Sequence, residues 1–236
     1  MTSIDPATLA RRERSRLMNG LVAPRPVAWV STVSPEGERN LAPFSFFNLF
    51  SYTPPVLAVG PGRRSGVEKD SLRNLTESGE FVVNMVDEAL AVLANASSAE
   101  FEPGVDEWAV LGLEGTPSDD VAPDRVTRAP AALECRVRQI IDLGTEGHRG
   151  NALVIADVTR VHVRDDALDG LVPVAEKLRL VARMGGNEWS TTRDRFELVR
   201  PVETDPEVVR RSISEPAAER PGPADLSGGH GAPAAD

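Results

Sequence analysis

Acid–base, nucleophilic and metal chemistry need histidines, cysteines or carboxylates held close together, and this chain offers few such groups. Its histidines are His148, His162 and His230, and its one cysteine is Cys135. None of them stands at a spacing typical of a metal site, and a single cysteine excludes an intramolecular disulfide. His148, in a glycine-rich loop, and His162, on the polar face of a strand, are typical of solvated side chains. The sequence therefore predicts no metal ion and no catalytic dyad or triad.

The aromatic side chains gather in one short stretch. Four of the seven phenylalanines stand in Asn40-Leu-Ala-Pro-Phe-Ser-Phe-Phe-Asn-Leu-Phe50. Clustered aromatic residues most often fill a core, and that interpretation stays open from the residues alone. Asn40, Ser45 and Asn48 argue against it, because buried polar side chains need hydrogen-bond partners. The edge of a flat heteroaromatic ligand would supply such partners.

A basic loop, Gly60-Pro-Gly-Arg-Arg-Ser-Gly-Val-Glu-Lys-Asp-Ser71, runs into a predicted helix. Free backbone amides, the positive end of the helix dipole, the Lys69 ammonium group and the Ser71 hydroxyl would suit a phosphate group. A solvated surface loop is the alternative, because many such loops carry arginine and lysine. No Rossmann or P-loop glycine pattern occurs.

Short strands must position both candidates. Apolar and β-branched residues predict strands over 27–33, 41–50, 56–59, 81–86 and 133–138, and the turn Ser34-Pro-Glu-Gly37 joins the first two as a hairpin. Helices are predicted over 71–77, with Asp70 as the cap and Gly79 after the end, and over 88–96.

The strand predicted over 153–164 changes parity along its length. Its apolar residues occupy even positions at Val154, Ala156 and Val158 and odd positions at Val161 and Val163. A β-bulge near Thr159 and Arg160 would produce this change, and bulges bend sheets. About six strands with few crossover helices favour an antiparallel barrel over a doubly wound parallel sheet.

Charge and composition narrow the class of protein. The formal net charge of -10 disfavours nucleic acid and anionic membranes as partners. The first residues lack the apolar run of a signal peptide, and no apolar stretch reaches membrane-spanning length, so a cytoplasmic protein is expected. We expect an extension over 1–18, one domain over 19–201, and a disordered Pro/Ala/Gly-rich tail over 202–236.

Several motifs occur together and in a recognisable order. They are Pro24-Arg-Pro-Val-Ala-Trp-Val-Ser-Thr32, Asn40-Leu-Ala-Pro-Phe-Ser-Phe-Phe-Asn48, Lys69-Asp-Ser71, Gly79-Glu-Phe-Val-Val-Asn84, Asn95-Ala-Ser-Ser-Ala-Glu-Phe101, Pro130-Ala-Ala-Leu-Glu-Cys135 and Val181-Ala-Arg-Met-Gly-Gly186. As a set they resemble the flavin reductase-like, FMN-binding split-barrel family over nearly the whole of the predicted domain.

This resemblance implies a mainly β fold, a six-stranded antiparallel split barrel with a few short helices. It also implies a homodimer with each FMN near the subunit interface. The residues expected at the flavin ring are Ser31, Thr32, Asn40, Ala42, Pro43, Ser45, Phe46, Phe47 and Asn48. Those expected at the phosphate end are Lys69, Asp70 and Ser71, with help from Arg63 and Arg64.

Two positions depart from the family pattern. Many relatives carry Gly-Asp-His before the penultimate strand, whereas this chain has Gly150-Asn151, with His148 slightly earlier. Trp189 stands where relatives usually carry a tyrosine after the Gly185-Gly186 pair. The first departure puts a standard nicotinamide site in doubt, and the second keeps a stacking surface of a different shape.

The resemblance implies an FMN-dependent oxidoreductase in which NADH or NADPH passes a hydride to N5 of FMN. A separate monooxygenase would be a possible recipient of the reduced flavin. The alternative is an FMN-binding electron carrier, similar to a flavoredoxin, without NAD(P)H activity of its own. A barrel that has lost flavin altogether is a third possibility, which the polar residues Ser31, Asn40 and Ser45 disfavour.

Overall fold

The computed structural model describes residues 1–64, 67–99, 101, 104–144, 150–198 and 205–214. The chain divides into two units, Met1–Arg193 and Asp194–Asp236, which we take separately. The second unit contains helix α6, Pro206–Ser214, where the sequence predicts only a disordered tail. The main sheet and the candidate site lie in the first unit.

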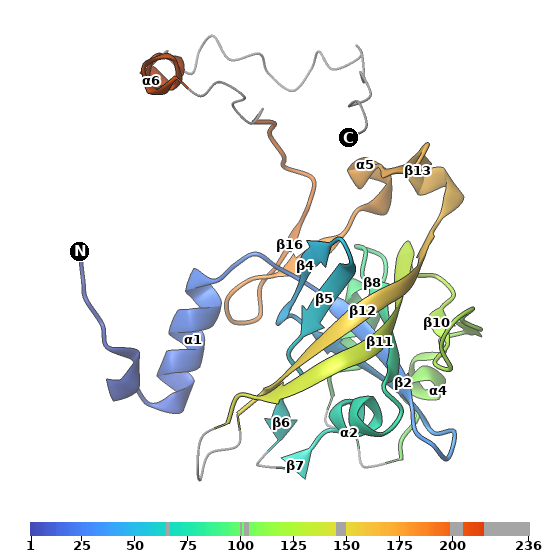
Figure 1. Ribbon diagram of the computed structural model, residues 1–236. Helices are drawn as coiled ribbons and strands as arrows, with labels where there is room; N and C mark the ends of the chain where they lie inside the picture. The colour runs from blue at the N-terminus through green and yellow to red at the C-terminus, as the bar shows by residue number, and fades with distance from the viewer. Residues whose placement is uncertain (65–66, 100, 102–103, 145–149, 199–204, 215–236) are drawn as a thin grey trace. The chain divides into compact units, whose positions relative to one another are not determined.

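A seven-stranded antiparallel sheet forms the body of the first unit (Figure 1). Its strands, in spatial order, are β3 (Arg39–Phe44), β2 (Ala28–Val33), β8 (Glu80–Met85), β11 (Ala131–Asp142), β12 (Ala152–Val163), β5 (Pro55–Val59) and β4 (Phe47–Tyr52). Each neighbouring pair is antiparallel. The predicted mainly β, antiparallel class is confirmed, with one strand more than expected.

The additional strand comes from the aromatic stretch. The sequence predicts one strand over 41–50, which is wrong, because β3 ends at Phe44 and β4 begins at Phe47. β3 pairs with β2, whereas β4 pairs with β5, and these two partners lie toward opposite edges of the sheet. One straight strand cannot pair with both, so the chain turns at Ser45 and Phe46.

Strand β2 is buried on both faces, since successive side chains point to opposite sides of a strand. Ala28 and Val30 join one apolar cluster, and Trp29 joins the other, together with Trp108. The first cluster also contains Leu72 and Leu75 of helix α2, Asp70–Glu77. Packing in this cluster therefore fixes α2 against the sheet.

The predicted bulge in the long hairpin β11–β12 is confirmed. Glu134 lies opposite Arg160, but Cys135 lies opposite Val158, so Thr159 has no partner in the register. A second irregularity follows between Val137 and Gln139. These bulges bend the hairpin, as the curvature of a barrel requires.

Short elements surround the sheet. The helices are η1 (Pro6–Thr8), α1 (Arg11–Leu21), α3 (Ala91–Ala96), α4 (Glu107–Leu111), η2 (Asp165–Ala167) and α5 (Ala175–Leu178). The small strands are β1 (Arg25–Pro26), β6 (Arg63–Arg64), β7 (Val67–Glu68), β9 (Gly115–Thr116), β10 (Arg125–Val126), β13 (Leu168–Asp169), β14 (Val172–Pro173), β15 (Val181–Arg183) and β16 (Trp189–Thr191). In the described part of the chain, no helix has the length and apolar character needed to cross a membrane.

Two predicted helix starts need correction. Helix α3 begins at Ala91 rather than at residue 88, because Asp87 forms a β-bridge with Leu180 and its carboxylate accepts a hydrogen bond from the amide of Leu90. Helix α2 begins at Asp70, so Lys69 is its cap residue. The predicted end is confirmed, because Gly79 follows α2 with a φ of 68°.

Candidate functional site

The turn between β3 and β4 meets the basic loop that follows β5. The backbone amide of Gly60 donates to the carbonyl of Phe46 at 2.6 Å. The carbonyl of Pro61 accepts a hydrogen bond from the amide of Ala152 at 3.1 Å. Segments predicted separately as a ring-binding and a phosphate-binding region thus lie side by side, together with the start of β12.

Gly60 allows this close approach. A Cβ atom at this position would lie 2.9 Å from the Cβ of Phe46, which no real pair of side chains tolerates without a shift. We expect Gly60→Ala to lower the free energy of unfolding by about 2 kcal/mol, a typical cost of overpacking. Urea denaturation measures this change in the free energy of unfolding.

Gly62→Ala is the matched control, because its Cβ would meet only the side chain of Asn151, with the nearest atom, Oδ1, at 3.4 Å. We expect this variant to unfold like the wild type. If both alanine variants had the same stability, the tight contact between Gly60 and Phe46 would not matter.

The aromatic stretch divides between core and surface. Phe44 is buried in the core, and Phe47 packs against it. Phe46 is 49% exposed and Phe50 is 70% exposed. The core interpretation therefore holds for the first two phenylalanines only, and the other two remain available to a ligand or a partner.

The remaining predicted ring-binding residues of β3 and β4 occupy different environments. Ala42 and Pro43 are half-buried and lie opposite Val30 and Trp29 of β2. The side chain of Asn48 is exposed, and its Oδ1 accepts a hydrogen bond from the next amide in the chain, that of Leu49.

Four polar side chains join β2 and β3 to the start of α2. Asn40 Nδ2 donates to Ser71 Oγ at 2.8 Å and to Thr32 Oγ1 at 3.4 Å. Asn74 Nδ2 donates to the same Thr32 oxygen at 3.1 Å. All four residues are buried. The structure brings the predicted ligand-binding residues Thr32, Asn40 and Ser71 together, but they bond to one another and so hold the end of α2 that carries Lys69.

Asn74 was not predicted, although its amide completes this group. Among the described residues, its Oδ1 has no hydrogen-bond partner. It lies beside a hollow of about 200 Å³ that Asn40, Asp70 and Arg73 also line. The sequence offered one signal for Asn74, because it is a polar residue on the apolar face of an amphipathic helix.

Ser31 lies on the far side of β2 from Thr32. Its hydroxyl donates to the carbonyl of Asp124 at 2.6 Å and accepts from Asn84 Nδ2 at 3.3 Å. Asn84 is fully buried and also accepts from the amide of Val126 at 2.7 Å. Ser31 therefore anchors the segment before β10, a role that the sequence did not reveal.

The N-terminus of α2 carries positive charge. Lys69 is exposed, and the first amides of a helix have no partner within the helix. Asp70 pairs with Arg73 at 2.9 Å, so its carboxylate is occupied along α2. Arg63 lies in β6, and its side chain falls outside the part of the chain that the structure describes. His148 also lies outside the described residues.

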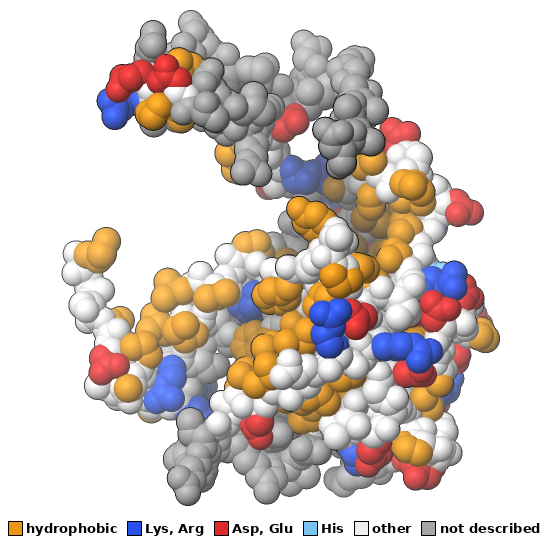
Figure 2. All heavy atoms as spheres, in the orientation of Figure 1, with side chains coloured by type: hydrophobic (Ala, Val, Ile, Leu, Met, Phe, Trp, Pro, Cys, Tyr) orange, Lys and Arg blue, Asp and Glu red, His pale blue; other side chains and the backbone are white. Residues whose placement is uncertain are grey.

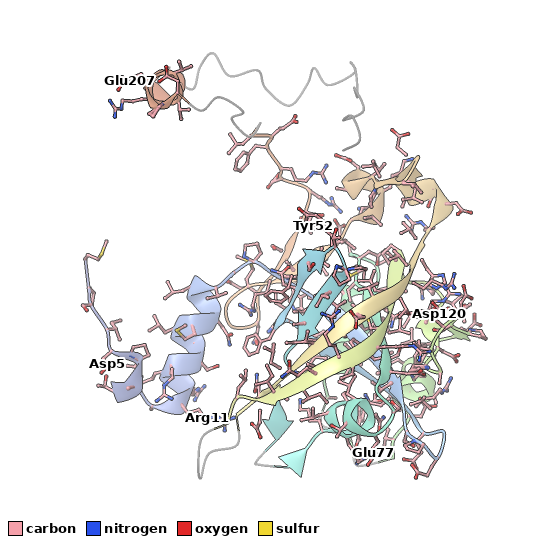
Figure 3. All side chains as sticks on the ribbon, viewed as in Figure 1. Asp5, Arg11, Tyr52, Glu77, Asp120 and Glu207 are labelled. Carbon is pink, nitrogen blue, oxygen red and sulfur yellow. The ribbon has the colours of Figure 1, made fainter. Side chains whose placement is uncertain are left out.

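Among the described titratable groups, Cys135 and the pair of Glu134 and His162 have structural rather than nucleophilic surroundings. Burial raises the pKa of the Cys135 thiol, and the charge of Glu134 raises it further, so the thiol stays protonated. His162 Nε2 lies 2.6 Å from Glu134 Oε1. Both oxygens of Glu134 also accept amide hydrogen bonds, from Asp119 at 2.9 Å and from Asp120 at 2.6 Å. This group therefore fastens a loop, on the side of the unit where Figure 3 labels Asp120.

A second hollow lies away from the predicted residues. It measures about 740 Å³ and is lined by residues such as Arg128, Ala132, Val161, His162 and Leu171. They lie at or next to the start of β11 and the end of β12, or between β13 and β14, whereas the loop beside the turn meets β12 at Ala152, through the carbonyl of Pro61. Ten residues of extended strand separate the two places, about 30 Å. We therefore place the candidate site at the turn and not in the larger hollow.

Trp189 lies in the small sheet formed by β1, β15 and β16. The guanidinium group of Arg183 stacks over its ring, 5.0 Å from the centroid. The ring also packs against the second apolar cluster. This cation–π contact occupies one face of the indole, so no catalytic role is assigned to it.

The fold defines the class of protein first. This unit is a mainly β split barrel: a solved structure with a split-barrel domain, from Shewanella frigidimarina, matches with a TM-score of 0.72 at 20% identity, over 83% of this chain and 96% of that one. The model of the flavin reductase like domain matches residues 19–181. The chain therefore belongs to the flavin reductase-like family, whose members are flavin-binding oxidoreductases.

Two solved structures are more similar in sequence. Nitrilotriacetate monooxygenase component B from Bacillus cereus is 34% identical with a TM-score of 0.81, over 84% of this chain and 98% of that chain. The 2-nitrobenzoate 2-nitroreductase of Pseudomonas fluorescens is 31% identical with a TM-score of 0.77, over 85% and 97%.

Proposed function

We propose that this protein binds FMN and transfers a hydride from NADH or NADPH to it. The observation that carries the proposal is the contact between the turn at Phe46 and the loop that leads to Lys69, within a chain of the flavin reductase-like family. The likeness to component B of a monooxygenase supports a further step, in which the reduced flavin serves a separate oxygenase component.

The residues present fit the two ends of FMN. The exposed ring of Phe46 and the backbone of its turn offer a flat surface with polar edges. Lys69 and the first amides of α2 offer donors and positive charge for a phosphate group. Bound FMN would supply the redox chemistry, since its ring accepts a hydride at N5.

The chain itself would contribute binding and orientation. The buried amides of Asn40 and Asn74 hold α2 against β3 and β2, so the phosphate-binding end would keep a constant separation from the sheet. A fixed separation favours transfer, because the reacting atoms need alignment at about 3–3.5 Å. No described residue needs to act as a proton donor in this scheme.

Anaerobic absorbance spectroscopy tests the proposal. We expect the flavin band of the FMN-loaded protein to bleach on addition of NADH or NADPH, well above the rate for free FMN. Bound flavin that neither nucleotide bleaches would support the electron-carrier alternative, which Gly150-Asn151 in place of Gly-Asp-His favours. Protein that neither binds FMN nor quenches its fluorescence would contradict both.

A homodimer forms part of this proposal. Apolar side chains stand exposed on β4 and at the end of α1, with Leu49 at 55%, Tyr52 at 86% and Leu21 at 72%. Figure 2 shows hydrophobic side chains gathered over this face. Exposed apolar area of this kind marks interaction surfaces. Light scattering on the same sample should give twice the chain mass of 25.4 kDa, and a monomer would remove the dimer from the proposal.

A further inference from the structure

The guanidinium group of Arg25, in the Pro24-Arg-Pro26 motif, binds three separate segments. Arg25 is only 8% exposed. NH1 donates to the carbonyls of Asn19 at 2.7 Å and Val22 at 2.6 Å, at the end of α1. NH2 donates to the carbonyl of Met184 at 3.1 Å, and Nε donates to Ser45 Oγ at 3.4 Å.

These partners are far apart in the sequence but close in space. Met184 follows β15. The next residue, Gly185, lies so close to α1 that a Cβ added to it would be 3.2 Å from the Cα of Gly20. Ser45 belongs to the turn between β3 and β4, where the amide of Gly60 binds the neighbouring carbonyl of Phe46. Arg25 thus connects α1 and the segment after β15 to the proposed ring-binding turn.

The contacts suit arginine and no other side chain. Burial lowers the pKa of Arg25, and the nearby charge of Arg183 lowers it further, yet a guanidinium group stays protonated under all ordinary conditions. Its donors lie in one plane and can reach several acceptors at once. Carbonyls in the last turn of a helix also favour a cation. Lysine has one nitrogen and cannot span the same acceptors.

We infer that Arg25 is a positioning residue for the flavin site: it sets the place of the Ser45–Phe46 turn without touching the flavin itself. The role of Arg25 in the flavin site rests on the proposed function. Its positioning of the turn does not depend on flavin binding. The turn, the end of α1 and the segment after β15 should loosen together when the guanidinium group is removed, because it is their shared partner.

Hydrogen exchange of the flavin-free protein tests the positioning. In Arg25→Met, amides 45–48, Gly60 and 184–186 should exchange at least tenfold faster than in the wild type, whereas those of β11 and β12 should not change. Arg25→Lys should fall between the two. Arg138→Met, which breaks an exposed ion pair with Asp157, is the matched control and should leave amides 45–48 unaffected. Unchanged exchange at 45–48 in Arg25→Met would overturn the inference, whether or not the protein binds flavin.

Flavin affinity tests the consequence for the site. The dissociation constants for FMN and riboflavin should both rise about tenfold in Arg25→Met, with their ratio unchanged, because the turn faces the ring that both share. The visible circular dichroism of the bound flavin should also change shape, which loss of stability alone would not cause. Faster exchange at the turn with unaltered affinity and spectrum would disprove a role in the flavin site. A wild-type protein that binds neither flavin would instead refute the proposed function, and exchange would still decide the positioning.

Discussion

Replacing Lys69 with glutamate is expected to weaken FMN binding about a hundredfold, which corresponds to about 3 kcal/mol, while riboflavin binding changes little. Only FMN carries the phosphate that the exposed ammonium group at the start of α2 would contact. The variant loses one charge-assisted hydrogen bond and gains a repelling carboxylate. Fluorescence titration with each flavin measures the two dissociation constants.

A matched charge reversal separates local contact from general repulsion. The chain already carries a formal charge of -10, so any added negative charge disfavours an anionic ligand. Arg128→Glu changes the net charge equally at an exposed position beside the large hollow, far from the turn. It should alter FMN affinity less than about twofold, because exposed charges are screened within about 10 Å. An equal loss of FMN and riboflavin in Lys69→Glu would remove Lys69 from the phosphate site.

Replacing Glu134 with alanine is expected to lower the free energy of unfolding by about 3 kcal/mol at neutral pH. Its side chain is fully buried and accepts hydrogen bonds from the amides of Asp119 and Asp120 and from His162. Removal leaves these donors without their acceptor, which costs more than a lost contact at the surface. Urea denaturation measures the difference.

The effect of Glu134 depends on pH in a defined direction. Burial by itself would raise the pKa of this carboxyl, but hydrogen bonds from the amides of Asp119 and Asp120 and from His162 outweigh it and hold the pKa below the ordinary value. The stabilisation is therefore complete above the unfolded pKa, about 4.3, and disappears as the pH falls through the lower folded value. The difference between wild type and variant should shrink over that range.

An exposed glutamate provides the comparison for Glu134. Glu114→Ala should change the stability by less than about 0.5 kcal/mol at any pH, as is usual for surface positions. His162→Leu should cost about 1 kcal/mol, since only one of the three hydrogen bonds is lost. If Glu134→Ala cost no more than Glu114→Ala, the loop before β10 would not depend on this carboxylate.

Local patterns predicted the elements of this fold better than their pairing. The change of parity after Val158 located the bulge in β12, because alternation along a strand reports directly which face is buried. The run over 41–50 was predicted as one strand, because apolar composition does not say which neighbour a strand has. Only the positions of β2 and β5 in the sheet require the turn at Ser45.

In the candidate site, too, local features could be predicted from the sequence and long-range contacts could not. The stretch around Phe46 and the loop before Lys69 were found from residue type, and the structure places them together. Thr32, Asn40 and Ser71 are expected at the flavin, and the structure shows in addition that they bond to one another. Arg25 was not found as a site residue, because its partner Met184 lies 159 positions away in the sequence. Contacts at such separations leave no periodic signal along the chain.

The hydrogen bond between Ala152 and Pro61 has a consequence for the coupling of folding to ligand binding. It extends the pairing of β12 with β5, two strands that are distant along the chain. Distant pairings carry an entropic cost, because the intervening chain must close into a loop. The turn, the loop and β12 therefore come together only in the folded chain, through pairings of high loop-closure cost. A ligand held there would recognise the folded chain alone and would draw the folding equilibrium toward it, by an amount that grows with ligand concentration.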